Sequence, residues 1–363
     1  MLTLRSLAEQ IGAELRGNPD APVRGLNTLD AAGPDEVSFI ANPTYVPKLA
    51  HTRALAVIVA PDLAEQVPSA ALVMGNPYLG YALASRLFVS REAERAEGIH
   101  PSATVDEAAV IGEGVSIGPN VVVEAGARIG ARTRIDAGCF IGTGSMVGED
   151  CHLYPHVTLY HGVTVGDRVI VHSGVVIGSD GFGFAPAFGD LSRQSARKDL
   201  SPGFYKIAQI GGVRIGNDVE IGANTTIDRG ALSDTVIEDG VKLDNQIQIA
   251  HNVRVGKHTV MAACSGIAGS TTVGSHCMIG GGVGIAGHLT LCDGVQITGM
   301  TLVSHSIHEP GTYSSGTAVE PNAQWRRNVA RFHQLDKLAR KVTALEKAIR
   351  QLASGSRSQE SED

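Results

Sequence analysis

The sequence lacks any apolar run long enough to cross a membrane, and its N-terminus lacks the basic start and hydrophobic stretch of a secretory signal. A formal net charge of −7 argues against general nucleic-acid binding. No Cys-x-x-Cys pair is present, and an odd number of dispersed cysteines is typical of a reducing cytoplasm. These absences predict a cytoplasmic protein with no membrane span and no nucleic-acid partner. The five cysteines are Cys139, Cys151, Cys264, Cys277 and Cys292.

Signatures of several common enzyme sites are also missing. The sequence contains no Gly-rich phosphate loop, no Gly-x-Ser-x-Gly elbow and no dinucleotide-binding fingerprint. The cysteines carry no acyl-enzyme signature, so direct transfer is the simpler route for any group that the protein moves. With 363 residues, 43% of them hydrophobic, the chain has room for two or three domains with real cores.

What the sequence contains instead is an aliphatic residue at every sixth position from Ile99 to Ile177. The same spacing returns over Ile215–Ile227 and, after a shift of four residues, over Ile237–Val303. A period of six matches neither a helix nor a single strand. In a parallel β-helix each hexad is one short strand whose aliphatic side chain points into a narrow core. Three hexads per coil predict about ten coils, stacked at ~4.8 Å.

Residues 1–98 lack this repeat and are predicted to form a small α/β domain. We expect a helix near residues 4–15, a strand over residues 54–60 and a second helix near residues 78–91. Residues 99–320 form the repeat domain, which is interrupted between Gly178 and Arg214 and again over residues 229–235. The longer interruption begins with Asp180-Gly-Phe-Gly-Phe184, which suggests a flap over a ligand or, alternatively, a plain packing loop.

Residues 321–352 change to a helical pattern, for which Asn322 is a plausible N-cap. Apolar residues then step by three and four, as in the seam of a coiled coil, which requires a partner helix. Eight basic and two acidic residues give this segment a local charge of +6. The segment is either a docking site for an acidic partner or a solvated coiled-coil face. Residues 353–363 are expected to be disordered. The seam consists of Leu335, Leu338, Val342, Leu345, Ile349 and Leu352.

Two of the thirteen histidines stand out as candidates for catalysis. His251 follows the inward-facing Ile249, and His288 lies two coils and one residue further on, so both are expected on one edge of the prism, roughly 10 Å apart. Histidine titrates in the range that a general base requires. Asp244 and Asn245 precede His251 by one hexad and are expected to orient it or to bind a sugar. The alternative for any single histidine is an ordinary surface residue.

A rival site consists of His156 and His161, with His152 nearby. Their spacing is similar to that of the zinc histidines in gamma-class carbonic anhydrases, which use the same prism and place a metal between subunits. Nothing else in the sequence supplies the rest of such a site. A solenoid that acts only as a scaffold or binding surface is the non-catalytic alternative.

Several long segments resemble one family, the UDP-3-O-acylglucosamine N-acyltransferases of lipid A synthesis, and the likeness covers nearly the whole chain. The resemblance implies a left-handed β-helix of the hexapeptide-repeat acyltransferases, with an N-terminal α/β domain, a C-terminal α-helical extension and a homotrimeric assembly. The segments are Ser38-Phe-Ile-Ala-Asn-Pro-Thr-Tyr45, Asn76-Pro-Tyr-Leu-Gly-Tyr-Ala82, Ile177-Gly-Ser-Asp-Gly-Phe-Gly183, Thr225-Thr-Ile-Asp-Arg-Gly-Ala231, Asp244-Asn-Gln-Ile-Gln-Ile-Ala-His-Asn252 and Tyr313-Ser-Ser-Gly316.

The resemblance also implies roles for individual residues. His251 corresponds to the general base, which would accept a proton from the amine of a glucosamine as it attacks a thioester. His288 corresponds to a second site histidine that orients substrate or donor. The positions that hold the uracil of a UDP-sugar correspond to Phe39, Asn42 and Tyr45. Asp244 and Asn245 correspond to sugar-side positions.

The donor implied by the resemblance is a (3R)-3-hydroxyacyl chain carried on acyl carrier protein, and no metal or diffusible cofactor is implied. Because acyl carrier protein is small and acidic, Arg326, Arg327 and Arg331 are the candidates for its docking site. Leu302 is the candidate for the far end of the acyl groove. The loop between residues 184 and 205 is longer than the family pattern. A related enzyme that uses acetyl-coenzyme A is the alternative, and it would not need a basic helix.

Overall fold

The protein is described here by a computed structural model, which covers residues 2–88, 97–188, 201–316 and 319–359. The chain divides into two compact units, residues 1–95 and 96–363. The first strand of the repeat begins at Gly98, one residue before the predicted start. No helix in the covered ranges is both long and apolar enough to cross a bilayer.

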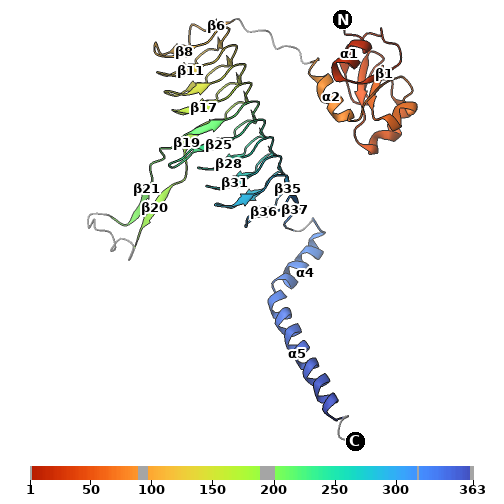
Figure 1. Ribbon diagram of the computed structural model, residues 1–363, viewed down its shortest axis with the longest axis vertical. Coiled ribbons are helices and arrows are strands. Elements are labelled where there is room, and N and C mark those ends of the chain that lie inside the picture. The colour runs from red at the N-terminus through yellow and green to blue at the C-terminus, as the bar shows by residue number, and fades with distance from the viewer. Residues whose placement is uncertain (1, 89–96, 189–200, 317–318, 360–363) are drawn as a thin grey trace. The chain divides into compact units, whose positions relative to one another are not determined.

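The N-terminal unit is a five-stranded sheet in the order β1-β5-β4-β3-β2, with two α-helices against one face (Figure 1). Strand β1 is antiparallel to β5, and the other neighbouring strands are parallel. The buried faces of the strands are aliphatic, so the sheet is held by cores on both sides. The elements are α1 (Leu4–Ile11), β1 (Glu14–Arg16), β2 (Gly25–Leu26), β3 (Glu36–Phe39), the 3-10 helix η1 (Pro43–His51), β4 (Ala56–Val59), the 3-10 helix η2 (Pro61–Gln66), β5 (Ala70–Val73) and α2 (Pro77–Ser85).

Both predicted helices of this unit are shorter than expected. Helix α1 ends at Ile11 because Gly12 adopts a left-handed conformation, with φ of 70°, and its N–H caps the last turn. The chain then enters β1, so Leu15 belongs to a strand and not to the helix. Helix α2 begins where the Asn76 side chain accepts the N–H of Leu79, and it ends at Ser85. The last predicted residues, 89–91, lie outside the described residues.

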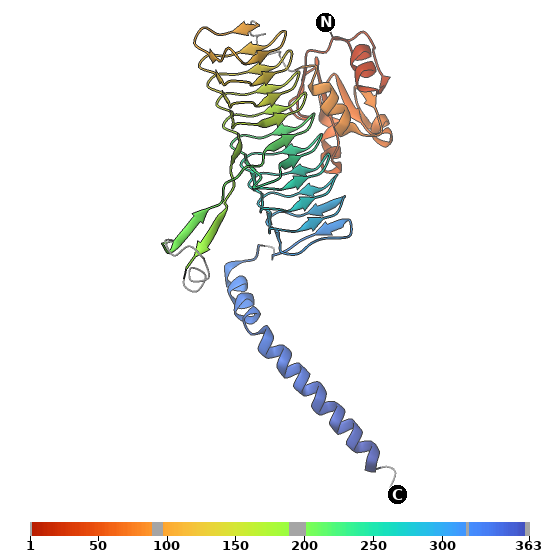
Figure 2. The same ribbon diagram turned by 60° about the vertical axis from the view of Figure 1, so that its left-hand side comes forward.

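The second unit is a parallel β-helix whose short strands form three sheets, one on each face of a triangular prism (Figures 1 and 2). Equivalent residues of neighbouring coils are 18 apart, as in the pairing of Val122 with Phe140. Among the described residues the sheets have ten, nine and eleven strands, which agrees with the predicted number of about ten coils.

We refer to the three sheets by their number of strands. The ten-stranded sheet consists of β7 (Thr104–Val105), β10 (Val122–Val123), β13 (Phe140–Ile141), β16 (Thr158–Leu159), β19 (Val176–Asp180), β24 (Thr226–Arg229), β27 (Gln248–Ile249), β30 (Gly266–Ile267), β33 (Gly284–Ile285) and β36 (Leu302–Val303). The nine-stranded sheet consists of β8 (Val110–Ile111), β11 (Arg128–Ile129), β14 (Met146–Val147), β17 (Val163–Val165), β22 (Val213–Ile215), β25 (Thr235–Ile237), β28 (Arg254–Val255), β31 (Thr272–Val273) and β34 (Thr290–Leu291). The eleven-stranded sheet consists of β6 (Gly98–Ile99), β9 (Ser116–Ile117), β12 (Arg134–Ile135), β15 (His152–Leu153), β18 (Ile170–Val171), β23 (Glu220–Ile221), β26 (Lys242–Leu243), β29 (Val260–Met261), β32 (Met278–Ile279), β35 (Val295–Ile297) and β37 (Gly311–Tyr313).

The aliphatic residue of each hexad points into the core of the prism, as predicted. From Ile117 to Val303 these residues are buried and form one continuous apolar cluster. The exception is the first coil, where Ile99 is half-exposed because no coil stacks over it. The repeat therefore fixes the inward register, and the residue before each aliphatic residue faces outward.

Both interruptions of the repeat leave the stacking intact. The longer one contains an antiparallel hairpin of β20 (Phe184–Ala187) and β21 (Gly203–Lys206), drawn in light green in Figure 2. The shorter one lies between β24 and β25 and adds four residues, since Val213 pairs with Thr235 across 22 positions. These four residues account for the shift in the repeat.

The C-terminal segment forms two helices, α4 (Asn322–Phe332) and α5 (Leu335–Gln359). The predicted N-cap is wrong by one residue, because Pro321 holds the cap position and Asn322 is already helical. The predicted disordered tail is also wrong as far as Gln359, since α5 continues through residues 353–359. No proline interrupts this stretch, and a single glycine costs a helix only about 1 kcal/mol. The seam residues from Leu335 to Ile349 are exposed.

Candidate functional site

His251 lies on the corner between the ten-stranded and nine-stranded sheets, which we term the histidine corner, directly after β27. Its Nδ1 is 3.0 Å from Oδ1 of Asn252. The Asn252 amide is oriented by other bonds, because its Nδ2 donates to Ser233 and its Oδ1 accepts the N–H of Ala231. Oδ1 is therefore an acceptor, and Nδ1 of His251 must carry the proton. When the ring is neutral, this leaves the lone pair on Nε2, the form required of a base.

Two glycines make room for the His251 side chain. A Cβ atom on Gly181 would lie 2.7 Å from Cβ of His251, and one on Gly269 would lie 2.6 Å from its Nε2. Any larger residue at either position would displace the ring. Gly181 belongs to the start of the long interruption, and Gly269 lies one coil after His251, so the ring is held between two separate segments of the chain.

His288 lies on the same corner, as its spacing predicts. The N–H of Ser270 donates to the carbonyl of His251, and the N–H of His288 donates to the carbonyl of Gly269. The preceding strands β27 and β33 are separated by the single strand β30, so the two histidines are two coils apart, about 10 Å along the prism. The His288 side chain is exposed.

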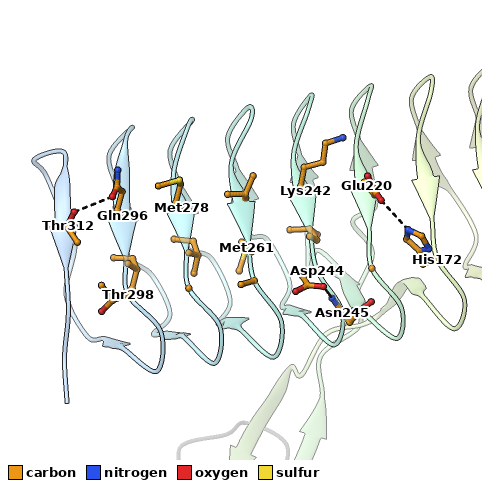
Figure 3. A pocket seen from close by; sticks show the side chains of 17 residues that line it. His172, Glu220, Lys242, Asp244, Asn245, Met261, Met278, Gln296, Thr298 and Thr312 are labelled. Carbon is orange, nitrogen blue, oxygen red and sulfur yellow. Dashed lines mark hydrogen bonds and ion pairs between the residues drawn. The ribbon is translucent and has the colours of Figure 1, made fainter. Parts of the chain in front are cut away.

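Asp244 and Asn245 lie on a different corner, between the eleven-stranded and ten-stranded sheets (Figure 3). Asp244 accepts the backbone N–H groups of Asn245 and Ala263, and Asn245 accepts that of Ala223. The expectation that Asp244 or Asn245 orients His251 does not hold within one protomer, because one hexad carries the chain to another edge of the prism. Both residues border a groove of about 690 Å³ on the eleven-stranded sheet.

A second groove, of about 380 Å³, crosses the ten-stranded sheet beside the histidine corner. Outward residues along it are small or apolar, and Leu302, which is 66% exposed, lies at its C-terminal end. The opposite end is polar and contains Thr226, Asp228 and Gln248. The residues between the two ends that leave it open are Ala250, Gly266, Ala268, Gly284 and Ala286.

Asp228 is a site residue for which the sequence predicted no role, although it lies in one of the segments that resemble the family. Its Oδ1 accepts a 2.7 Å hydrogen bond from the Ser179 hydroxyl. Burial raises the pKa of Asp228 above its usual range, although the Ser179 hydrogen bond and the electrostatic influence of the nearby His251 act in the opposite direction. The carboxyl group and the imidazole therefore lie close enough to influence one another.

The N-terminal unit contains a separate pocket of about 460 Å³ at the end of β3. The three residues predicted to hold a nucleotide base, Phe39, Asn42 and Tyr45, all line it. Phe39 stacks on Tyr81 with ring centres 4.0 Å apart, and Asn42 accepts the N–H of Thr44, which leaves its NH2 group to donate. Tyr78 also lines the pocket, although its place in the sequence predicted no role for it.

The zinc alternative finds no support in this structure. Nε2 of His152 is 2.9 Å from a carboxylate oxygen of Asp136, and the ring of His161 contacts the guanidinium of Arg229. Across the covered ranges of one protomer, no group of three or more His, Cys, Asp or Glu side chains is arranged to hold a metal ion.

The candidate docking arginines, Arg326, Arg327 and Arg331, lie on α4 and are exposed. Within the described residues, no carboxylate pairs with any of the three. Arg327 and Arg331 are one turn apart and share one side of the helix. Their charges are therefore available to an external partner.

Comparisons with known proteins identify the class. The family described as UDP-3-O-(3-hydroxymyristoyl) glucosamine N-acyltransferase matches residues 20–87, and the GMPPB C-terminal domain family matches residues 95–180. The solved structure of Arabidopsis UDP-N-acetylglucosamine acyltransferase is similar in fold, with a TM-score of 0.50 and 21% identity over 64% of this chain and 77% of that one. The repeat domain is thus a left-handed parallel β-helix. Full-length relatives show that the protein is an acyltransferase.

Full-length relatives narrow the class to one family. UDP-3-O-acylglucosamine N-acyltransferase of Hahella chejuensis (strain KCTC 2396) is 59% identical over 348 residues, or 96% of both chains. The protein of that description from Pseudomonas aeruginosa (strain UCBPP-PA14) is 56% identical over 96% of this chain and 94% of its own. The chain belongs to the UDP-3-O-acylglucosamine N-acyltransferase family.

Proposed function

We propose that the protein transfers a (3R)-3-hydroxyacyl chain from acyl carrier protein to the 2-amino group of UDP-3-O-(3-hydroxyacyl)glucosamine, which forms the UDP-2,3-diacylglucosamine precursor of lipid A. The observation that carries this proposal is the free Nε2 of His251 beside a groove lined by small residues. Family membership supports the acceptor sugar. The reaction takes place in the cytoplasm, which agrees with five unpaired cysteines.

In the proposed mechanism, Nε2 of His251 accepts a proton from the amine as its nitrogen attacks the carbonyl carbon of the thioester. The resulting tetrahedral oxyanion is stabilised by a hydrogen-bond donor such as a backbone N–H. The carbon–sulfur bond then breaks, and the proton held by His251 passes to the departing thiolate. His288 orients the substrate or the donor. The thioester supplies the activated acyl group, so no metal or further cofactor takes part.

The proposed assembly is a homotrimer. Within one protomer, His251 and the pair Asp244–Asn245 occupy different corners of the prism. A site that uses the base and both sugar-side residues therefore needs a second copy of the chain, so that one protomer presents its histidine corner to its partner's Asp244 corner. The exposed seam of α5 supports this assembly, because a stripe of aliphatic residues at such spacing requires partner helices.

The nucleotide and the donor occupy their own surfaces in this proposal. The uracil base lies in the pocket of Phe39, Asn42 and Tyr45, where an aromatic ring and an amide donor suit a flat polar base. Acyl carrier protein docks on Arg326, Arg327 and Arg331 of α4, whose positive charge attracts an acidic partner. The acyl chain lies in the groove that ends at Leu302.

The test is to incubate the purified protein with UDP-3-O-acylglucosamine and 3-hydroxyacyl carrier proteins of several chain lengths, and to follow diacylated product by mass spectrometry. We expect product with one preferred chain length. Acetyl-coenzyme A serves as the competing donor. Acylation by acetyl-coenzyme A, with none from the carrier protein, would contradict the proposed donor.

A second test addresses the nucleotide pocket. Phe39→Ala removes the aromatic surface beside the base, so KM for the UDP-sugar should rise by about tenfold while kcat changes little. Ser85→Ala, which removes a hydroxyl elsewhere in the same unit, is the matched control. An unchanged KM in Phe39→Ala would mean that the nucleotide binds outside this pocket.

A further inference from the structure

Asp228 occupies an unusual position in the groove of the ten-stranded sheet. One row of outward residues lies next to the histidine corner and crosses the neighbouring strands β24, β27, β30 and β33. It consists of Asp228, Ala250, Ala268 and Ala286. Of the described residues that line the groove, Asp228 alone carries a charge. A carboxylate beside three alanines contributes nothing to apolar packing and requires a hydrogen-bond donor.

One of the two oxygen atoms of the Asp228 carboxyl group has a hydrogen-bond donor within the protein. Oδ1 accepts the Ser179 hydroxyl at 2.7 Å, from the strand that pairs with β24. In the part of the chain that the structure covers, Oδ2 accepts no hydrogen bond. The Ser179 contact fixes the carboxyl group, so Oδ2 is a positioned acceptor at the polar end of the groove.

The position of Asp228 relative to His251 restricts which hydrogen-bond donor of a bound substrate can contact the Asp228 carboxyl group. Asp228 precedes Ala250 by one coil, a spacing of about 4.8 Å, and His251 follows Ala250 directly. An acyl chain whose carbonyl carbon lies at His251 places its third carbon within two bonds of that point. The remaining carbons extend along the alanine row towards Leu302, where the groove is apolar. A polar group on the third carbon is therefore the one that Asp228 can reach.

We propose that Oδ2 of Asp228 accepts a hydrogen bond from the 3-hydroxyl group of the acyl chain in this groove, and that this contact selects hydroxylated chains. The inference rests on the proposed function and adds a specificity-determining residue to it. A chain without the hydroxyl leaves the carboxylate buried under methylene groups without a partner. Sites built to hydrogen-bond a substrate hydroxyl reject analogues that lack it for this reason.

The experiment compares the wild-type protein with Asp228→Ala and Asp228→Asn. Each is given donors of equal chain length with and without the 3-hydroxyl, and kcat/KM is measured for both from diacylated product. We expect the wild type to favour the hydroxylated donor, and this preference to fall by about tenfold or more in Asp228→Ala, as for the loss of a hydrogen bond to a charged group. Asp228→Asn keeps the shape of the side chain, and its preference should also fall.

Thr226→Val is the matched control, because Thr226 lines the same end of the groove and its hydroxyl is bonded to Gln248. Its preference for the hydroxylated donor should match the wild type. An equal fall of kcat/KM with both donors in the Asp228 variants would overturn the inference, since it would indicate a general role at His251 or in folding. An unchanged preference would overturn it as well.

Two further outcomes distinguish an error in the assignment of the groove to the donor from an error in the proposed function. The acceptor sugar also carries a hydroxylated chain in the proposed reaction, so acceptors with and without that hydroxyl form a second arm. A change of preference confined to the acceptor arm would place the acceptor's chain in the groove and overturn the assignment to the donor. Absence of diacylated product from the wild type with every donor would instead contradict the proposed function.

Discussion

The two halves of the β-helix have the same interior and different exteriors. Along the ten-stranded sheet, the inward residues are aliphatic and buried from Val123 to Val303. The outward residues of the first half include Val122 and Phe140, whereas those of the second half include Gly266 and Gly284. The repeat that specifies the fold therefore leaves the outer surface free to change, and the groove lies where outward residues become small.

The largest expected effect is the difference between replacing His251, which faces outward, and replacing Ile249, which faces inward two positions earlier. His251→Ala should lower kcat by about 10²- to 10⁴-fold, because it removes the proposed base, and the thermal stability and assembly should be retained. Ile249→Ala should instead lower the free energy of unfolding by about 2–5 kcal/mol, because it leaves a cavity in the core. Normal turnover by His251→Ala would exclude it as the base.

The second prediction concerns a variant that fills the groove with a larger side chain. A Cβ atom on Gly266 would meet nothing closer than 3.9 Å, so Gly266→Leu is tolerated by the backbone and places its side chain in the groove. Turnover with long acyl donors should fall by about tenfold or more, because one added side chain excludes several methylene groups. Donors with short chains should lose much less. Val122→Leu, on the same sheet in the first half, is the control, and an equal effect of both variants would contradict the assignment of the groove.

A third prediction compares two glycines by stability. A Cβ atom on Gly130, at a corner of the prism, would lie 2.4 Å from the carbonyl carbon of Gly148 in the next coil. Gly130→Ala should therefore lower the free energy of unfolding by about 1–3 kcal/mol, as overpacking does. Gly266→Ala should raise it by about 0.4–1 kcal/mol, since the residue fits and restricts the unfolded chain. Chemical denaturation measures both values, and a similar loss in the two variants would contradict the distinction.

The smallest effect concerns thiol reactivity inside and outside the prism. Cys264 is exposed, whereas Cys139 is buried, and burial raises the pKa of the Cys139 thiol to about 11. At pH 8 a thiol reagent should label Cys264 within minutes and leave Cys139 unmodified until the protein unfolds. Because the folded pKa is raised, the stability contributed by the neutral Cys139 thiol is complete below its unfolded pKa and is lost as the pH rises through about 11. Mass spectrometry of the labelled peptides checks the order.

The interior of the repeat domain was predictable because a single residue type recurs at a single spacing. Each aliphatic residue from Ile117 onward occupies the core, and the shift of four residues corresponds to an insertion between β24 and β25. The relation between Asp244 and His251 was not predictable in the same way. Adjacent hexads are close in sequence but lie on different faces of the prism, so proximity along the chain does not imply contact.

The local contacts of the site depend on segments that are distant in sequence. Asn252 could be identified from its motif, but its orientation depends on Ser233 and Ala231. The role of Asp228 depends on Ser179, which is 49 residues away. The location of the groove could be predicted from the sequence, because glycine directly precedes successive aliphatic positions of this sheet. Helix α1 ends early because Gly12 adopts the left-handed conformation, a choice that a helical pattern alone does not reveal.

The stacking across the long hairpin makes this position suitable for protein engineering. Val163 pairs with Val213 across 50 residues, whereas most equivalent residues of neighbouring coils are 18 apart, and the ladder continues on both sides. Lengthening such a closed connection costs only about 0.6 kcal/mol for each doubling of its length. A reporter domain or affinity tag introduced between β20 and β21 would therefore be carried on the enzyme without a shift in the register of any coil.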